Sequence, residues 1–85
     1  MARIIIYTTP ICSYCVRAKM LLQKKGASFE EIDVSKNADL RQNMTEKSGG
    51  KTSVPQIFID DKHIGGSDDL YDLESQGKLD NLLAS

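Results

Sequence analysis

The sequence has no long hydrophobic run. The apolar residues 4–7 near its start are too few for the core of a secretory signal peptide. No stretch approaches the ~20 apolar residues that a membrane-spanning helix needs. We therefore expect a cytoplasmic protein without a membrane partner.

The sequence also has no excess of charge of one sign. Its 11 lysine and arginine residues and 12 aspartate and glutamate residues give a formal net charge of −1. Proteins that bind nucleic acid or anionic membranes have a clear basic excess, so neither class of partner is expected. Internal repeats are absent too, and a chain of 85 residues suffices for a single small domain, residues 1–85.

Cysteine and histidine are scarce. The chain has two cysteines, Cys12 and Cys15, and one histidine, His63. A closed zinc site takes four ligands, which disfavours a complete site within one chain. A disulfide between the two cysteines would close too short a loop to stabilise the fold much. Because such a pair in a small chain without a secretion signal is more often redox-active or metal-binding, redox chemistry is favoured and a zinc half-site stays open.

The spacing of apolar residues predicts alternating strands and helices. Strands are expected at residues 4–8, 28–34, 54–59 and 63–64, and helices at 13–25, 37–47 and 67–76, with a short helical turn near 79–83. Ser67 is expected to be the N-cap of the third helix. A strand–helix–strand order favours a parallel pair, and the last two strands form a hairpin. The sequence thus predicts an α/β fold in the order β-α-β-α-β-β-α, with a four-stranded mixed sheet flanked by helices.

The segment Cys12-Ser13-Tyr14-Cys15 lies where the first predicted strand gives way to the first helix. At a helix N-terminus, free backbone N–H groups and the positive end of the helix dipole favour a thiolate over a thiol. The thiolate is the nucleophilic form, so Cys12 is the candidate nucleophile. Cys15 lies one turn further along the helix and can resolve a mixed disulfide by attacking the sulfur of Cys12.

Three motifs in this order resemble those of the glutaredoxins, and most of all those of the small bacterial glutaredoxin 3 type. They are the CxxC motif, Thr52-Ser53-Val54-Pro55 before the third strand, and Gly65-Gly66-Ser67-Asp68-Asp69 after the hairpin. The similarity extends over nearly the whole chain. It implies a thioredoxin-like fold, glutathione as co-substrate and a cis peptide bond before Pro55.

The resemblance also implies a glutathione-binding site. The backbone of Val54 would bind the cysteinyl part of glutathione, the helix start at Gly66 and Ser67 its γ-glutamyl carboxylate, and Asp68 its ammonium group. Arg41 matches a position that often meets the glycine carboxylate. From the residues alone, the Gly65-to-Asp68 segment would be an ordinary capped helix start, and Arg41 could equally be a solvated surface charge. The whole implied set is Tyr14, Arg41, Ser53, Val54, Pro55, Gly66, Ser67 and Asp68.

The chain departs from the usual glutaredoxin pattern near the motif. Thr9 stands where many members have a lysine, which removes one cation that stabilises the thiolate, and Lys51 is a candidate substitute. Ser13 replaces the proline that is common within the motif. The loop from Gly50 to Ser53 is one residue longer than usual. We expect the serine to alter the flexibility of the turn and the redox poise.

Three functional hypotheses follow, and the first is favoured. It is a monomeric, glutathione-dependent thiol–disulfide oxidoreductase that reduces protein disulfides and glutathionylated proteins through Cys12, with Cys15 as the resolving thiol. The second is a dimer that binds a [2Fe–2S] cluster through Cys12 of each chain and two glutathiones, because soft thiolate ligands suit iron–sulfur chemistry. The third is a non-catalytic thioredoxin-fold module with an unreactive Cys12.

Overall fold

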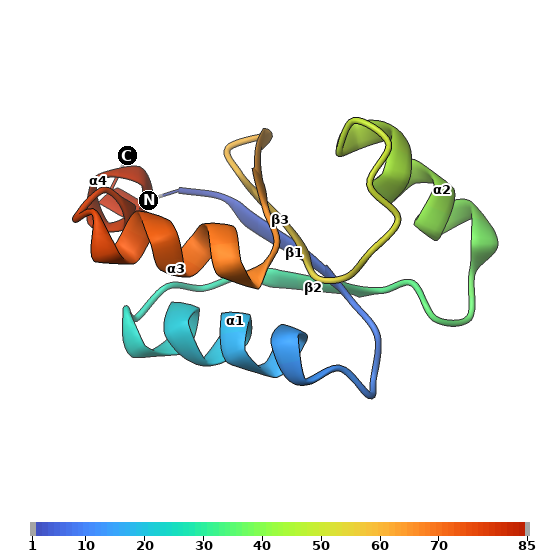
Figure 1. Ribbon diagram of the computed structural model, residues 1–85, viewed down its shortest axis with the longest axis horizontal. Coiled ribbons are helices and arrows are strands. Elements are labelled where there is room, and N and C mark those ends of the chain that lie inside the picture. Colours follow the sequence, from blue (N-terminus) through green and yellow to red (C-terminus); the bar gives the residue numbers. More distant parts are fainter. Residues whose placement is uncertain (1, 85) are drawn as a thin grey trace.

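A four-stranded mixed sheet runs through the middle of the molecule, as seen in a computed structural model that describes residues 2–84 (Figure 1). The strand order is β2-β1-β3-β4, with β1 parallel to β2 and antiparallel to β3, and with β3 and β4 paired as a hairpin. The predicted class, element order and mixed sheet are confirmed. The strands are β1 (Ile4–Thr8), β2 (Glu30–Asp33), β3 (Gln56–Ile59) and β4 (Lys62–Gly65), and the helices are α1 (Ser13–Lys24), α2 (Ala38–Lys47), α3 (Ser67–Ser75) and α4 (Leu79–Ala84).

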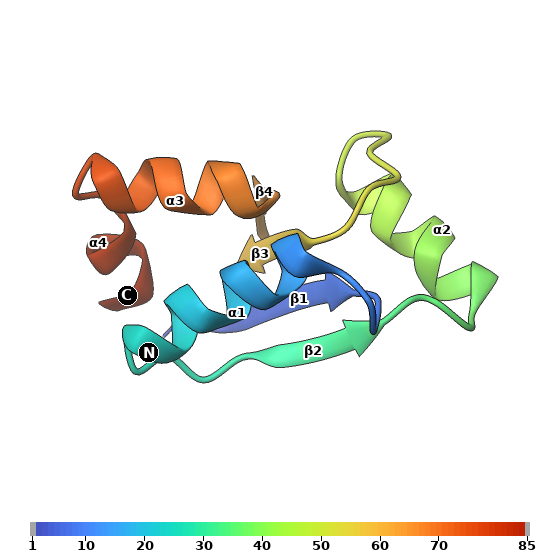
Figure 2. The ribbon, with the colours of Figure 1, turned by 60° about the horizontal axis from the view of Figure 1, so that its bottom comes forward.

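Alternation along β1 divides its apolar side chains between the two faces of the sheet. Ile4 and Ile6 belong to the larger core cluster, to which α1 contributes Leu22. Tyr7 belongs to a second cluster with Met44 of α2. Figures 1 and 2 show α1 and α3 side by side, with α2 apart from them at the far end of the strands. Helices on both faces therefore fix the end of β1, from which residues 9–11 lead to the CxxC motif.

The start of α3 differs from the prediction. The structure makes Gly66 the N-cap and places Ser67 inside the helix, so the expected capping role of Ser67 is wrong. The Gly66 N–H donates instead to the Asp69 carboxylate at 2.9 Å. The Ser67 side chain is buried. Packing at this helix start thus overrides the local preference of serine for the N-cap position.

The two ends of the described chain meet at one end of the molecule. The Lys25 ammonium, just after α1, contacts Glu74 of α3 at 2.7 Å and Asp80 of α4 at 2.9 Å, and these carboxylates raise its pKa. The Ala2 N–H donates to the Leu83 carbonyl at 3.4 Å. Figures 1 and 2 both place the two ends away from the start of α1. The CxxC motif and the chain ends therefore lie at opposite ends of the fold.

Leu22 allows a direct test of the larger core. Its side chain is fully buried, whereas Met20 on the same helix is 60 % exposed. Leu22→Ala is expected to lower the free energy of unfolding by about 3 kcal/mol, because the lost transfer energy and the cavity both destabilise the fold. Met20→Ala, the control, should change it by less than about 0.5 kcal/mol. Urea denaturation followed by circular dichroism measures both, and equal losses would contradict the packing.

Candidate active site

Cys12 is the N-cap residue of α1. Its backbone is extended, with φ −153° and ψ 106°, and its Sγ accepts a hydrogen bond from the Cys15 N–H at 3.1 Å. Its side chain is half-buried, so a sulfur of another molecule can reach it. The N–H donor and the positive end of the helix dipole both stabilise negative charge on this sulfur. The structure places Cys12 where the pattern predicts, while its role as nucleophile stays a prediction.

Cys15 lies within α1 and is 1 % exposed. Burial raises the pKa of its thiol from an ordinary 9.0 to about 12, and the hydrogen bond and charge of Cys12 also raise it, against lowering by the Thr9 backbone and the Lys19 charge. At pH 7, the Cys15 thiol is therefore protonated. The two thiols therefore differ sharply, because Cys12 is accessible whereas Cys15 is shielded and protonated.

This difference predicts selective alkylation. At pH 7, iodoacetamide is expected to modify Cys12 at least about 100-fold faster than Cys15, because it reacts with accessible thiolates. Since the pKa of Cys15 is raised, its alkylation should increase with pH and level off only near pH 12. Peptide mapping by mass spectrometry after timed quenching measures both rates. Chain unfolded in urea is the control, with similar rates expected at both positions, and similar rates in the folded chain would contradict the burial of Cys15.

A groove of about 280 Å³ borders the start of α1. Three segments form it: the first turn of α1, the loop before β3 and the start of α3. All but one of the residues expected to bind glutathione line it, the exception being Arg41. The complete lining is Tyr14, Lys51, Ser53, Val54, Pro55, Gln56, Gly66, Ser67, Asp68 and Asp69.

The loop before β3, which borders this groove, carries a backbone N–H without an acceptor among residues 2–84. The peptide bond between Val54 and Pro55 is cis, as the resemblance implies. Within residues 2–84, no group accepts a hydrogen bond from the Val54 N–H. A backbone N–H without an acceptor at the edge of a groove can pair with an extended peptide laid beside it.

The start of α3 supplies the polar end of the groove. Ser67 is 3 % exposed, and its hydroxyl has no hydrogen-bond partner among the described residues. A buried polar group without a partner is costly, which makes the hydroxyl a strong candidate to pair with a bound group. The hydroxyl and the N–H groups at the start of this helix suit a carboxylate, and the exposed Asp68 suits an ammonium group. This end of the groove therefore fits the charged groups of an α-amino acid.

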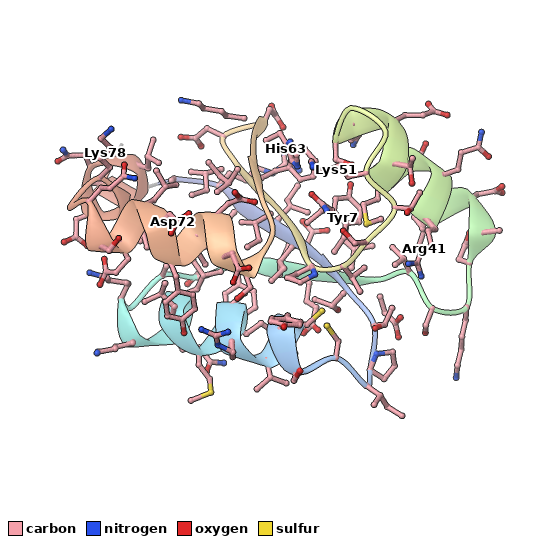
Figure 3. All side chains as sticks on the ribbon, in the orientation of Figure 1. Tyr7, Arg41, Lys51, His63, Asp72 and Lys78 are labelled. Carbon is pink, nitrogen blue, oxygen red and sulfur yellow. The ribbon has the colours of Figure 1, made fainter. Side chains whose placement is uncertain are left out.

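Two cations lie on the α2 side of the molecule (Figure 3). Lys51 is exposed and lines the groove. Arg41 does not line it, because its Nη2 donates to the Thr52 carbonyl at 2.8 Å. Arg41 therefore holds the loop on which the groove is built, and its contact with a ligand carboxylate stays a prediction.

Gln56 and Asp69 also line the groove, although the sequence pattern did not mark them as groove residues. Gln56 is 1 % exposed, and its Nε2 donates to the Ser53 carbonyl at 3.0 Å. The signal that could have revealed it is an amide within the otherwise apolar residues 54–59, because a buried amide must find hydrogen-bond partners. Asp69 looks like an ordinary acidic residue of a first helical turn, and only the fold shows that it borders the groove.

The described residues contain neither a cluster of metal ligands nor a membrane-spanning helix. Nowhere in residues 2–84 do three or more His, Cys, Asp or Glu side chains gather in a way that could hold a metal ion. No helix in that range is both long and apolar enough to cross a membrane.

Comparison with known proteins assigns the family. The family model described as Glutaredoxin matches residues 4–64. The chain belongs to the glutaredoxin family. Glutaredoxin 3 of Escherichia coli (strain K12) is 55 % identical over 83 residues, which cover 98 % of this chain and 99 % of that protein. The resemblance noted from the three motifs is therefore confirmed, and thiol oxidoreductase activity follows from the family.

Solved glutaredoxin structures share the fold. The buckwheat glutaredoxin–glutathione complex is 29 % identical, with a TM-score of 0.88 and coverage of 98 % of this chain and 77 % of that one. A structure described as "Metal Binding of Glutaredoxins" is 59 % identical, with a TM-score of 0.75 and coverage of 98 % and 89 %. The thioredoxin-like fold that the resemblance implies is confirmed for this glutaredoxin.

Proposed function

We propose that this chain is a glutathione-dependent thiol–disulfide oxidoreductase in which Cys12 is the nucleophile and Cys15 the resolving thiol. The observation that carries the proposal is the buried, unpartnered Ser67 hydroxyl in a groove beside the helix that Cys12 caps. Such a groove has the chemistry to hold a glutathionyl group with its sulfur at Cys12. A glutathione complex of a buckwheat relative supports this proposal.

Each part of glutathione has a proposed partner in the groove or beside it. The Val54 N–H donates to the cysteinyl residue, and the start of α3 with the Ser67 hydroxyl binds the γ-glutamyl carboxylate. Asp68 pairs with the ammonium group. Lys51 or Arg41 meets the glycine carboxylate, since both are cations on the α2 side of the molecule. The proposed contact surface also includes Tyr14, Ser53, Pro55 and Gly66, which line the same groove.

Glutathionylated proteins are reduced in two exchange steps. The Cys12 thiolate attacks the glutathione sulfur of the mixed disulfide, which forms a Cys12–glutathione disulfide and releases the protein thiolate. A second glutathione thiolate then attacks the bound glutathione sulfur, which regenerates the Cys12 thiolate and forms glutathione disulfide. In the complete cycle, one protein–glutathione mixed disulfide and one free glutathione become one protein thiol and one glutathione disulfide. The cytoplasm, where we place the chain, supplies the reduced glutathione.

Protein disulfides follow a route that uses both cysteines. Attack by Cys12 forms a mixed disulfide with the substrate, and Cys15 then attacks the Cys12 sulfur and releases the second substrate thiolate. Formation of the mixed disulfide removes the charge of Cys12, one of the causes that raise the pKa of Cys15. Cys15 is therefore more easily deprotonated once the intermediate exists than before it. Two glutathiones reduce the Cys12–Cys15 disulfide.

A turnover assay with a glutathionylated peptide tests the proposed function. The reduced chain is mixed with the peptide and with glutathione, and release of the free peptide thiol is followed. Under single-turnover conditions without free glutathione, mass spectrometry should find a glutathione adduct on Cys12. Absence of catalysed release, or an adduct at another residue, would overturn the proposal.

A second candidate function is binding of a [2Fe–2S] cluster between two chains. Cys12 is the accessible thiol of each chain, since Cys15 is buried, so one thiolate per chain is available as a ligand. The relative described by "Metal Binding of Glutaredoxins" makes the test worthwhile. Anaerobic reconstitution with iron, sulfide and glutathione should then give a coloured dimer in size-exclusion chromatography, whereas a colourless monomer would contradict this function.

A further inference from the structure

A chain of hydrogen bonds connects the β3–β4 hairpin to the loop that borders the groove. His63 Nε2 lies 2.7 Å from Gln56 Oε1. Gln56 Nε2 donates to the Ser53 carbonyl at 3.0 Å and lies 3.4 Å from the Ser53 hydroxyl. Gln56 is 1 % exposed, so its amide is shielded from solvent within the series, between the half-buried His63 and the exposed Ser53. Three residues from β4, β3 and the loop are thus joined in one series.

The direction of each bond in this series is fixed. Because the Gln56 amide nitrogen donates to Ser53, its oxygen faces His63 and can only accept. His63 must therefore carry a hydrogen on Nε2 and donate it to Gln56. The ring of His63 also lies against Phe58, with centroids 5.1 Å apart, which holds the imidazole in place. Figure 3 shows His63 on the hairpin, on the same side as Lys51.

The end of the series determines where the Val54 N–H points. The Ser53 carbonyl and the Val54 N–H belong to the same peptide unit, and the cis bond follows one residue later. In a planar trans peptide these two groups point in opposite directions. Anchoring the Ser53 carbonyl to the buried Gln56 therefore turns the Val54 N–H away from Gln56. Within residues 2–84 this N–H has no acceptor, and Val54 lines the groove.

We propose that Gln56 and His63 are positioning residues that hold the Ser53–Val54 peptide so that the Val54 N–H is ready to bind the peptide backbone of a glutathionyl substrate. This inference rests on the proposed function. Gln56 acts through Ser53, and His63 acts through Gln56 by orienting its amide. Hydrogen bonds in series also polarise one another, which makes the final N–H a better donor. The residues thus set the preference for glutathione over thiols that lack a peptide backbone.

The test compares two substrates with the same reacting sulfurs. One is a peptide in mixed disulfide with glutathione, and the other is the same peptide in mixed disulfide with cysteamine, which has no peptide group for Val54 to bind. The readout is kcat/KM for the glutathione substrate divided by kcat/KM for the cysteamine substrate. A general loss of activity cancels in this ratio. Gln56→Leu removes the hydrogen bonds to His63 and to Ser53 and should lower the ratio about tenfold, the effect of a lost or misdirected hydrogen bond of ordinary strength.

His63→Phe supplies an independent variant that keeps a ring against Phe58 and removes the donor. It should lower the ratio about threefold, since Gln56 still reaches Ser53 but is less well oriented. The double variant should match Gln56→Leu alone, because His63 acts only through Gln56. A fully additive loss in the double variant would overturn the series. If Gln56→Leu does not fold, the ratio in His63→Phe decides, and an unchanged ratio overturns the proposal.

Leu79→Val is the control for general destabilisation. Leu79 is fully buried in the larger core cluster and does not line the groove. Leu79→Val should lower the melting temperature and leave the ratio unchanged. If its ratio fell as much as that of Gln56→Leu, the Gln56 effect would be explained by lost stability, and the proposal would be overturned. Failure of the proposed function would look different, because the wild-type chain would then show no preference for the glutathione substrate. An unchanged ratio in the variants beside a clear wild-type preference would overturn the positioning role alone.

Discussion

Cys12→Ser is expected to lower the rate of glutathionylated-peptide reduction by at least about 10³-fold. A serine hydroxyl stays protonated at neutral pH, and its oxygen is a poor nucleophile toward a disulfide sulfur. No other thiol can replace it, because Cys15 is 1 % exposed and burial raises its pKa to about 12. The measurement is the steady-state rate of peptide-thiol release at fixed glutathione, corrected for the uncatalysed exchange.

Ser13→Ala is the matched control for this variant. Ser13 is the exposed neighbour of Cys12, and its replacement leaves both thiols in place. Its rate should stay within about threefold of the wild-type rate, since alanine, like serine, lacks the proline ring that would stiffen the turn, and an exposed substitution of this size has little effect. A Cys12→Ser rate within tenfold of the wild type would assign the chemistry to another group.

Cys15→Ser is expected to separate the two routes. Reduction of a glutathionylated peptide should stay within about threefold of the wild type, because the second glutathione resolves the intermediate without Cys15. Reduction of a protein disulfide should fall roughly 100-fold, because resolution from within the chain is lost and must wait for glutathione from solution. Parallel assays on the two substrates with one enzyme preparation measure the loss of rate on each.

The same variant gives a direct view of the intermediate. With a protein disulfide as substrate, the Cys15→Ser chain should accumulate as a mixed disulfide that non-reducing electrophoresis detects. Equal losses on both substrates would contradict the resolving role and would make Cys15 a structural residue of α1. Loss of the glutathionylated-peptide activity alone would reverse the assigned roles of the two cysteines.

Most of the fold could be predicted because local and long-range preferences agree along this chain. The β-branched residues 4–8 form β1 as expected, and Gly26 takes the positive φ of +70° that ends the first helical segment. The third strand begins at Gln56 instead of Val54. Pro55 explains the difference, since it has no N–H to donate to a neighbouring strand.

The site was less predictable because its contacts depend on register and burial. His63 looks like an ordinary hairpin residue until the pairing of Phe58 with His63, and the register shift between Ile57 and Phe58, bring it to Gln56. Ser67 has the local signature of an N-cap, but its side chain is buried at the groove. No pattern in the sequence encodes either contact, because each joins side chains whose positions depend on how separate elements pack.

The meeting of the chain ends has a practical consequence for engineering. Because Ala2 is bonded to Leu83 at the end of the molecule away from Cys12, a reporter protein joined near either end would leave from the side opposite the groove. The same placement suits attachment to a sensor surface, with the reactive sulfur facing the solution. The short distance between the ends also makes the chain suitable for insertion into a loop of a fluorescent protein, where both junctions must lie close together.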